Sequence, residues 1–325
     1  MGIVVIGTVF VDVKGFPDGV YIPNGRNAGR VEYVHGGVAR NVVEDIANLE
    51  LRPTFIGTVD NTSMGKDVVE KLARHKVNVD YVNTVPDGMG TWLALFDNNG
   101  DVAGSISHRP DTYLSYPILE AHGDEIFKDC DSVILELDLH KDVVKKTFEL
   151  AEKYNKKVYA LVSNMRIALE RRDFLQQLDC FICNEHEAGL LFLEDYTETE
   201  PEEMRDILAE KIKSANIASM IVTMGAKGAV YADVHGNKGW VAAKKVVVAD
   251  TTGAGDAFCA GAMSGLTYGK SLEDAIQIGN TLAASVITST DNVCPRFRPE
   301  EFGLNVKKLY KIGLCYGQSK EQIVK

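Results

Sequence analysis

Short, almost wholly apolar runs alternate with amphipathic stretches along most of this chain, and this rhythm restricts the fold more than any other feature. The apolar runs are strand candidates at Ile3–Ile6, Phe55–Val59, Val133–Leu137, Val158–Val162, Cys180–Cys183 and Met220–Thr223. Helical spacing of apolar residues is found between them at Asn41–Leu49, Lys66–His75, Lys141–Tyr154 and Glu202–Lys213. Continuously apolar strands are typical of a sheet covered on both faces. The alternation therefore predicts an α/β fold of three layers, with a mostly parallel central sheet flanked by helices.

Two regions interrupt the rhythm and predict a small second sheet. Residues 11–35 carry Gly, Pro and Asn among alternating β-type residues, and residues 90–107 indicate a hairpin with a turn at Asp97-Asn98-Asn99-Gly100. A hairpin inserted in a parallel α/β protein packs away from the main sheet and could cover a site. We therefore expect a main domain of residues 1–10, 36–89 and 113–325, with a β-sheet lid of residues 11–35 and 90–112. A further hairpin is expected over Ala229–Val248.

The charge and cysteine content narrow the class of protein. The 325 residues carry 46 Asp and Glu against 35 Lys and Arg, a formal net charge of −11. This balance argues against a binder of nucleic acid or of membrane surfaces, because both need a positive field, but it leaves anionic small molecules possible. No apolar run reaches the ~20 residues of a membrane helix. With no export signal and six scattered cysteines, we expect reduced thiols and a cytoplasmic location.

The strongest motif is Asp-Thr-Thr-Gly-Ala-Gly-Asp-Ala-Phe at 250–258, between the strand-like Lys245–Ala249 and the small-residue helix Ala254–Leu266. Such a strand-to-helix turn leaves bare N–H groups at the positive end of a helix, where phosphate oxygens bind. Asp256 lies in the first turn, where its carboxylate could meet a substrate hydroxyl. The alternative is that Asp256 merely caps the helix, but a run of nine residues in this order favours the phosphate site.

This segment resembles the second signature of the ribokinase-like carbohydrate kinases, the PfkB family. The resemblance implies the ribokinase-like fold, with Asp256 as the catalytic base. It also implies that the amides of Gly253, Ala254, Gly255 and Asp256 form an anion hole for the transferring phosphoryl group. The cosubstrate would be ATP, with magnesium bridging its phosphates.

A second match lies at Gly36-Gly37-Val38-Ala39-Arg40-Asn41, which resembles the first signature of the family. There Gly36 and Gly37 would let a sugar approach the backbone, and Asn41 would bond a hydroxyl. The alternative is a helix that simply opens on glycines. The chain departs from the family pattern after the helix that ends at Leu49, where Glu50 stands in place of the usual Gly.

Weaker matches follow in the expected order along the chain. The resemblance implies that Asp12 binds the substrate, that Asn184 and Glu187 act near the phosphates and a magnesium-bound water, and that Thr223, Gly225 and Asn280 line the nucleotide site. Each also has a plain structural interpretation, as a turn residue, a solvated helix residue or a strand-end glycine. Many members of the family bind a monovalent cation such as K⁺. Here its ligands would be Asp250 and backbone oxygens near Thr252 and the Ser289–Cys294 loop, although Asp250 could equally cap a strand end.

The form of the first signature resembles that of pseudouridine kinases. The leading hypothesis is therefore an ATP-dependent kinase for a primary hydroxyl of a ribose-like sugar or nucleoside, with pseudouridine as the expected acceptor. Trp92 and Tyr21 could stack on a base, or they could pack within the small sheet or a dimer interface. Arg109 could hold a phosphate or a base carbonyl, or it could face solvent. The alternatives are a kinase of free ribose or fructose and a non-catalytic sugar or nucleotide sensor. We also expect a possible homodimer through the lid.

Two other nucleotide-binding classes are excluded by their missing motifs. A dinucleotide-dependent oxidoreductase needs G-x-G-x-x-G after the first strand, where this chain has only Gly7. A P-loop NTPase needs G-x-x-x-x-G-K-[ST], which the chain also lacks.

Overall fold

A nine-stranded sheet forms the centre of the protein in the computed structural model, which describes residues 2–304. The strand order is β13-β12-β11-β10-β9-β8-β1-β4-β5. Seven neighbouring strands from β11 to β5 run parallel, and β12 and β13 are antiparallel at one edge. The bounds are β1 Gly2–Ile6, β4 Thr54–Val59, β5 Asn78–Thr84, β8 Cys130–Glu136, β9 Lys157–Leu161, β10 Cys180–Asn184, β11 Ser219–Thr223, β12 Ala229–Asp233 and β13 Lys238–Val241. All six predicted strands are confirmed.

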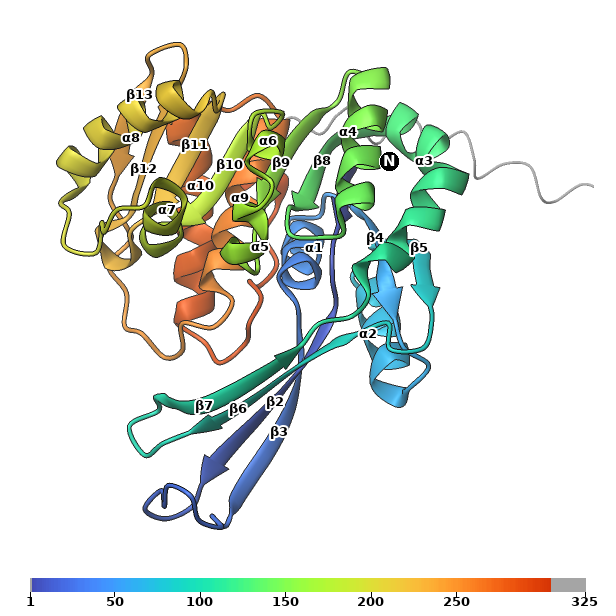
Figure 1. Cartoon of the computed structure of the whole chain (residues 1–325), viewed down its shortest axis with the longest axis vertical. Coiled ribbons are helices and arrows are strands. Elements are labelled where there is room, and N and C mark those ends of the chain that lie inside the picture. Colours follow the sequence, from blue (N-terminus) through green and yellow to red (C-terminus); the bar gives the residue numbers. More distant parts are fainter. Residues whose placement is uncertain (1, 305–325) are drawn as a thin grey trace, which may run out of the picture.

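Helices cover both faces of this sheet, so the three-layer prediction is confirmed (Figure 1). One layer contains α3 Tyr116–Asp129, α4 Lys141–Lys153, α5 Met165–Leu169, α6 Arg172–Leu175, α7 Glu185–Phe192 and α8 Pro201–Ala215. The other contains α1 Val38–Asn48, α2 Ser63–Arg74, α9 Ala254–Thr267 and α10 Leu272–Ile287. None of the helices between residues 2 and 304 is long and apolar enough to cross a bilayer.

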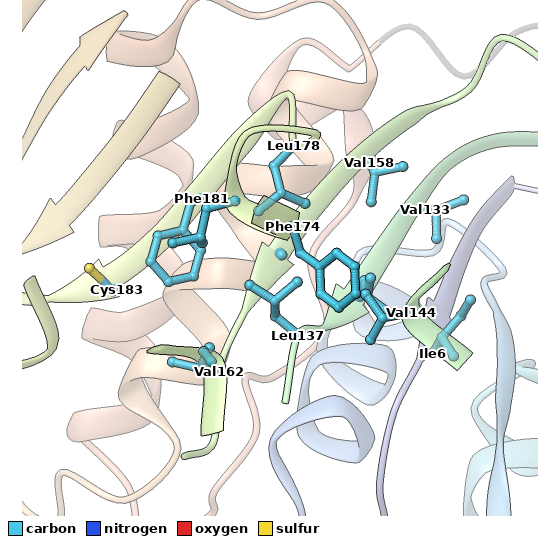
Figure 2. Close-up of a cluster of buried hydrophobic side chains, with 14 of the residues drawn as sticks. Ile6, Val133, Leu137, Val144, Val158, Val162, Phe174, Leu178, Phe181 and Cys183 are labelled. Carbon is cyan, nitrogen blue, oxygen red and sulfur yellow. The ribbon is translucent and has the colours of Figure 1, made fainter. Parts of the chain in front are cut away.

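The central strands explain why their sequences are apolar at every position. Side chains alternate between the two faces of a strand. On β1, Val4 and Ile6 enter the core under α3–α8, whereas Ile3 and Val5 enter the core under α1, α2, α9 and α10. Figure 2 shows part of the first core, in which Ile6 and Val133 lie near Val144. Both faces of the sheet are thus packed, which places the functional groups at the ends of the strands.

The predicted second sheet is confirmed and projects from the main body (Figure 1). It has four strands in the order β3-β2-β6-β7, with bounds β2 Phe10–Pro17, β3 Gly29–Gly36, β6 Gly90–Phe96 and β7 Val102–His108. The pairs β2–β3 and β6–β7 are antiparallel, while β2 and β6 pair in parallel. We call it the small sheet. The apolar side chains of Val31, Leu93 and Ile106 are exposed on it.

The expected strand at Lys245–Ala249 is absent from the described structure, so that prediction is wrong. The hairpin expected over Ala229–Val248 is correspondingly shorter, because its second strand ends at Val241. Val247 and Val248 are 87% and 59% exposed, and Ala249 N–H donates to the Ile287 carbonyl of α10 rather than to a neighbouring strand. A β-branched run predicts a strand only where a sheet edge accepts it.

Helix α1 ends in a left-handed residue, as the family pattern implies, but the residue is Glu50 and not glycine. Glu50 has φ 59°, and its N–H donates to the Ala47 carbonyl while the Leu51 N–H reaches the Ile46 carbonyl. These two bonds form a Schellman motif. Glutamate at position 50 therefore preserves the turn, but its side chain makes the left-handed backbone locally strained.

Glu50→Gly is therefore expected to stabilise the protein, because glycine adopts a left-handed φ without steric cost. We expect the free energy of unfolding to rise by about 0.5–1 kcal/mol, measured by urea denaturation. Glu50→Ala is the control, since alanine keeps the Cβ that causes the strain. An equal gain from both variants would mean that the charge of Glu50, and not its backbone, is unfavourable.

Candidate active site

The turn at 250–256 joins the exposed 242–249 segment to α9 and opens that helix. Gly253 is the N-cap with φ 81°, and Thr252 N–H donates to Asp250 Oδ1 at 2.8 Å. Gly255 and Asp256 lie in the first turn of α9, where a helix offers no acceptor for N–H groups. Ala254 N–H differs, since it donates to the Thr251 carbonyl at 3.2 Å. The turn thus has the free donors and the helix dipole that bind an anion.

Asp256 and Asn41 are 215 positions apart, yet their side chains are hydrogen-bonded. Asn41 Nδ2 donates to Asp256 Oδ2 at 2.7 Å, so the two predicted signatures meet at one point. Burial raises the pKa of Asp256 to about 7, while the hydrogen bond from Asn41 and the charge of Arg40 oppose the shift. A carboxyl with a pKa near neutrality is suited to accept a proton from a hydroxyl.

Asp12 lies against the glycines of the first signature. A Cβ on Gly36 would lie 2.4 Å from Asp12 Oδ1, so only glycine lets this carboxyl approach the backbone. Burial raises the pKa of Asp12, opposed by the charges of Lys14 and Arg40. Arg40 itself is fully buried beneath the site, with Nη1 2.7 Å from Glu44 Oε2.

A pocket of about 460 Å³ contains the predicted substrate residues, and we call it the Asp256 pocket. It lies between the small sheet, which contributes Phe10, Asp12, Trp92 and Ser107, and the helices and loops of the main domain. The remaining lining residues are Gly37, Val38, Asn41, Arg109, Ser163, Asn164, Thr252, Gly253 and Asp256. Carboxyl, amide and hydroxyl groups predominate, as they do in sites that bind polyhydroxylated ligands.

A second pocket, of about 500 Å³, lies on the other side of the same turn, and we call it the Asn280 pocket. Its walls include the apolar side chains of Phe258, Val246 and Ile287, together with Thr223 and Gly225 from the end of β11. Asn280 is buried there, and its Nδ2 donates to the Ala242 carbonyl at 3.1 Å, which holds the 242–249 segment over the pocket. Apolar walls with a few polar groups suit a flat heterocycle.

The 251–256 turn separates these two pockets and contributes to both. Thr252, Gly253 and Asp256 line the Asp256 pocket, whereas Thr251, Ala254 and Gly255 line the Asn280 pocket. An anionic group held at the turn is therefore within reach of ligands on either side. This arrangement can pass a group such as a phosphoryl from one bound molecule to the other.

Asn184 and Glu187 form the capping box that starts α7. Asn184 Oδ1 accepts from Glu187 N–H at 2.8 Å, and Asn184 N–H donates to Glu187 Oε2 at 2.9 Å. Neither residue lines the Asp256 pocket or the Asn280 pocket. Asn184 is nevertheless paired in register with Thr223 of the Asn280 pocket. Burial raises the pKa of Glu187, and its charge contributes to the raised pKa of Asp256.

The residues expected around a monovalent cation also lie close together. A Cβ on Gly253 would come within 2.1 Å of the Asn292 carbonyl oxygen, so the 289–294 loop touches the turn. Burial alone would raise the pKa of Asp250, but hydrogen bonds from Thr252, together with the charge of Lys14 and a hydrogen bond from Thr251, lower that pKa. Between residues 2 and 304 no group of three or more His, Cys, Asp or Glu side chains is placed to hold a metal.

Sequence analysis missed two parts of the site. Asn292 Nδ2 donates to the His35 carbonyl at 2.8 Å and lies 3.4 Å from Asn41 Oδ1, so it positions Asn41. Asp138 lies just beyond the end of β8, a position where parallel sheets place ligand-binding residues, and this was the signal that could have found it. Asp138 pairs with Arg109 at 2.7 Å, so the interpretation of Arg109 as solvent-facing is wrong.

Comparison with known proteins agrees with this geometry. "Guanosine-inosine kinase" of Exiguobacterium acetylicum is 36% identical over 292 residues, covering 89% of this chain and 95% of that protein. "Pseudouridine kinase" of Escherichia coli (strain K12) is 24% identical, covering 88% and 90%. The structure of Arabidopsis thaliana ribokinase complexed with ribose and ATP shares the fold, with a TM-score of 0.79 at 19% identity, covering 92% of this chain and 97% of that one. The family described as pfkB family carbohydrate kinase matches residues 2–293. The chain therefore belongs to the pfkB family of carbohydrate kinases, enzymes that transfer a phosphoryl group to an alcohol.

Proposed function

We propose that the protein transfers the γ-phosphoryl group of ATP to a primary hydroxyl of the ribose in a nucleoside. The observation that carries this proposal is the 251–256 turn, whose residues line both pockets. ATP would place its adenine in the Asn280 pocket and its phosphates at the turn. The nucleoside would lie in the Asp256 pocket, with its ribose hydroxyls at Asp12 and Asn41. The small sheet would act as the lid over it.

In this mechanism Asp256 takes the proton of the acceptor hydroxyl as the oxygen attacks the γ-phosphorus. The bond between that phosphorus and the β–γ bridging oxygen breaks, and ADP leaves with the electron pair. The free N–H groups of the turn and the N-terminus of α9 stabilise the negative charge on the transferring group. The reaction needs no further side-chain nucleophile.

The residues near the turn fit the cations that such a transfer uses. Magnesium prefers oxygen ligands and usually keeps several waters beside one or two carboxylates and phosphate oxygens. The Glu187 carboxylate would hold it through water. Asp250, whose lowered pKa keeps it ionised, would hold K⁺ together with backbone oxygens of Thr252 and the Ser289–Cys294 loop. When bound, these cations neutralise phosphate charge.

A purine nucleoside is the acceptor that we propose, in place of the pseudouridine expected from sequence. The guanosine-inosine kinase is 36% identical to this chain, whereas the pseudouridine kinase is 24% identical. Trp92 lines the Asp256 pocket and offers a ring face for a base. Free ribose or fructose would leave that part of the pocket unused.

The test is ADP release with ATP and magnesium against guanosine, inosine, adenosine, pseudouridine, ribose and fructose. We expect turnover with purine nucleosides and little with free sugars. Turnover with ribose or fructose alone would replace the proposal by a free-sugar kinase, and preference for pseudouridine would restore the sequence expectation. If no acceptor is phosphorylated while ATP binds, the sensor alternative would stand.

The activity should depend on the protonation of Asp256. Because a general base must be ionised and the pKa of Asp256 is about 7, kcat/KM is expected to fall about tenfold per pH unit below pH 7. Asn41→Ala removes the hydrogen bond that lowers this pKa, so the midpoint should move to higher pH. A pH–rate profile from pH 5 to 9 measures both. An unchanged midpoint in Asn41→Ala would show that Asn41 does not influence the group whose titration controls the activity.

We also propose that two copies associate through the outer face of the small sheet. Strand register places Tyr33, Val13, Leu93 and Ile106 in one row on that face. Tyr33 is 64% exposed, Leu93 41% and Ile106 70%, so most of the row is exposed apolar surface. Such surfaces mark interfaces.

A cytoplasmic location remains our expectation.

Ile106→Asp is expected to convert a dimer, with twice the 35.6 kDa mass of the chain, into a monomer. A charge buried between two copies without a partner would be strongly unfavourable. Light scattering coupled to gel filtration measures the mass. Leu193→Asp is the control, since Leu193 is 81% exposed but lies at the end of α7. A monomeric wild-type protein would refute the proposal.

A further inference from the structure

Arg109 follows β7 and reaches into a buried acidic cluster beside the Asp256 pocket. Its Nη1 lies 2.7 Å from Asp138 Oδ2 and donates to Ser163 Oγ at 2.8 Å. Its Nη2 lies 3.5 Å from the Asp138 carbonyl oxygen and 3.7 Å from Glu136 Oε1. The side chains of Glu136 and Asp138 are fully buried, whereas that of Arg109 is 22% exposed and lines the pocket.

The cluster holds the guanidinium in one orientation. Ser163 Oγ lies 2.9 Å from both Glu136 Oε1 and Asp138 Oδ2, yet its hydroxyl has one hydrogen to donate. Burial and the neighbouring Asp138 raise the pKa of Glu136 to about 7. Ser163 Oγ thus bridges the two carboxyl groups, and the charge of Arg109 opposes the rise in the pKa of Glu136.

Part of the Arg109 donor set remains for a ligand. A guanidinium carries five N–H groups in a planar fork. The two short contacts of Arg109 with Asp138 and Ser163 both come from Nη1. Nη2 also donates to the Asp138 carbonyl at 3.5 Å, which leaves one hydrogen on Nη2 and the Nε hydrogen without a hydrogen-bond partner among residues 2–304. The ligand group that complements these two N–H donors is a carbonyl or a ring nitrogen.

Strand register places Arg109 away from the groups proposed to hold the ribose. Asp12 on β2, Trp92 on β6 and Ser107 on β7 are paired in one row across the small sheet, and all three line the pocket. Neighbouring strands lie ~4.8 Å apart, so Ser107 is roughly 10 Å from Asp12. Arg109 comes two residues after Ser107. A nucleoside whose ribose lies at Asp12 would extend past Trp92 towards Arg109.

We propose that Arg109 selects the base by donating hydrogen bonds to O6 and N7 of a 6-oxopurine nucleoside. These two acceptors lie on one edge of the base and match the guanidinium fork. Adenine instead carries an amino group at position 6. Its N–H donors would face the N–H donors of Arg109, so no hydrogen bond would form there. Trp92 supplies the face on which the base stacks. The inference rests on the proposed function, because it needs a nucleoside in the Asp256 pocket.

The test crosses two enzymes with two acceptors: wild type and Arg109→Lys, each with inosine and with purine riboside, which lacks the 6-oxygen and the N1 hydrogen but keeps N7. We expect the wild type to prefer inosine by about 10- to 100-fold in kcat/KM. In Arg109→Lys most of this preference should disappear through a higher KM for inosine, while purine riboside is little affected. An equal loss on both acceptors would show a merely structural role and overturn the proposal.

Two further variants keep the test decisive. Arg109→Met removes every donor and should abolish the preference, but it leaves buried carboxyls without their cation and could unfold the protein. Arg109→Lys keeps the charge, and its melting temperature shows whether the fold survives. Arg166→Met is the matched control, since Arg166 is exposed on α5 and does not line the pocket; its preference should equal that of the wild type.

The outcomes also separate this inference from the proposed function. If the wild type phosphorylates inosine and purine riboside equally well, Arg109 does not read the 6-oxygen, although the nucleoside kinase stands. If the wild type phosphorylates ribose and no nucleoside, the proposed function fails and the inference fails with it.

Discussion

Asp256→Asn is expected to lower kcat by about 10²- to 10⁴-fold while ATP still binds, because the amide keeps the shape of the side chain and cannot accept the hydroxyl proton. Asn41 Nδ2 can still donate to the remaining carbonyl oxygen, so the local hydrogen bond survives. Steady-state kinetics with the preferred nucleoside gives kcat, and calorimetric titration with ATP gives the affinity. Near-normal turnover would show that Asp256 is not the general base.

The stability of this variant provides a second and independent readout. The pKa of Asp256 is raised from 3.8 to about 7 in the folded protein. Folding therefore disfavours the ionised carboxylate, and this cost develops as the pH rises from the unfolded towards the folded pKa. Asparagine cannot ionise and avoids the cost. The melting temperature of Asp256→Asn should exceed that of wild type at pH 8, with an advantage that shrinks as the pH falls from 7 towards 4.

Asp274→Asn is the matched control, because Asp274 occupies the same third position of α10 that Asp256 occupies in α9. Both residues lie in the first turn of a helix, where a negative charge is favourable. Only Asp256 lines the pocket that we assign to the acceptor. The control should therefore lose at most a few tenths of a kcal/mol of stability and no activity.

The main sheet could be predicted from sequence because packing on both of its faces produces a recognisable run of apolar residues in each strand. Strands covered on both faces must be apolar at every position, and Cys180–Cys183 and Met220–Thr223 show this as plainly in sequence as in the structure. The valines at 246–248 have the same composition but lie beside the Asn280 pocket with no neighbouring strand. Composition alone does not report whether a sheet edge is available.

The site was predictable where function imposes a local motif and not where it depends on long-range contacts. The Asp256 turn and Gly36–Asn41 each have a backbone requirement that shows in the sequence. Asn292 instead acts through one contact with Asn41, 251 positions away, and Asp138 acts through Arg109. Such a pairing leaves no mark on the residues next to Asn292, whereas Asp138 was marked only by its place just after a strand of the parallel sheet.

Gly253 holds the two halves of the site together through a backbone contact that leaves no room for a side chain. A Cβ there would lie 2.1 Å from the Asn292 carbonyl oxygen, and φ is 81°. The loop of Asn292 is also fixed, since Cys294 N–H donates to Asp45 Oδ1 at 2.6 Å and Asn48 Nδ2 donates to the Cys294 carbonyl at 2.7 Å. The loop therefore cannot move away from an added Cβ on Gly253 at low energetic cost.

A movement of the Asn292 loop would also displace Asp256, the proposed catalytic base. Asn292 Nδ2 donates to the His35 carbonyl and lies 3.4 Å from Asn41 Oδ1, and Asn41 in turn donates to Asp256. A displacement of a few tenths of an ångström at Asn292 would thus be passed on to the Asp256 carboxyl. Catalysis is sensitive to displacements of this kind, because the base must meet the hydroxyl within hydrogen-bond distance.

Gly253→Ala is consequently expected to lower kcat by about 100-fold and the free energy of unfolding by about 2–4 kcal/mol. Kinetics and urea denaturation measure the two effects. Gly255→Ala is the matched control two residues further on, because a Cβ there meets nothing within 4 Å and the backbone is not left-handed. Since alanine favours a helix, this control should gain up to about 1 kcal/mol. If Gly253→Ala proves as stable as the control, the contact with Asn292 does not exist in solution, and the link from that loop to Asp256 falls with it.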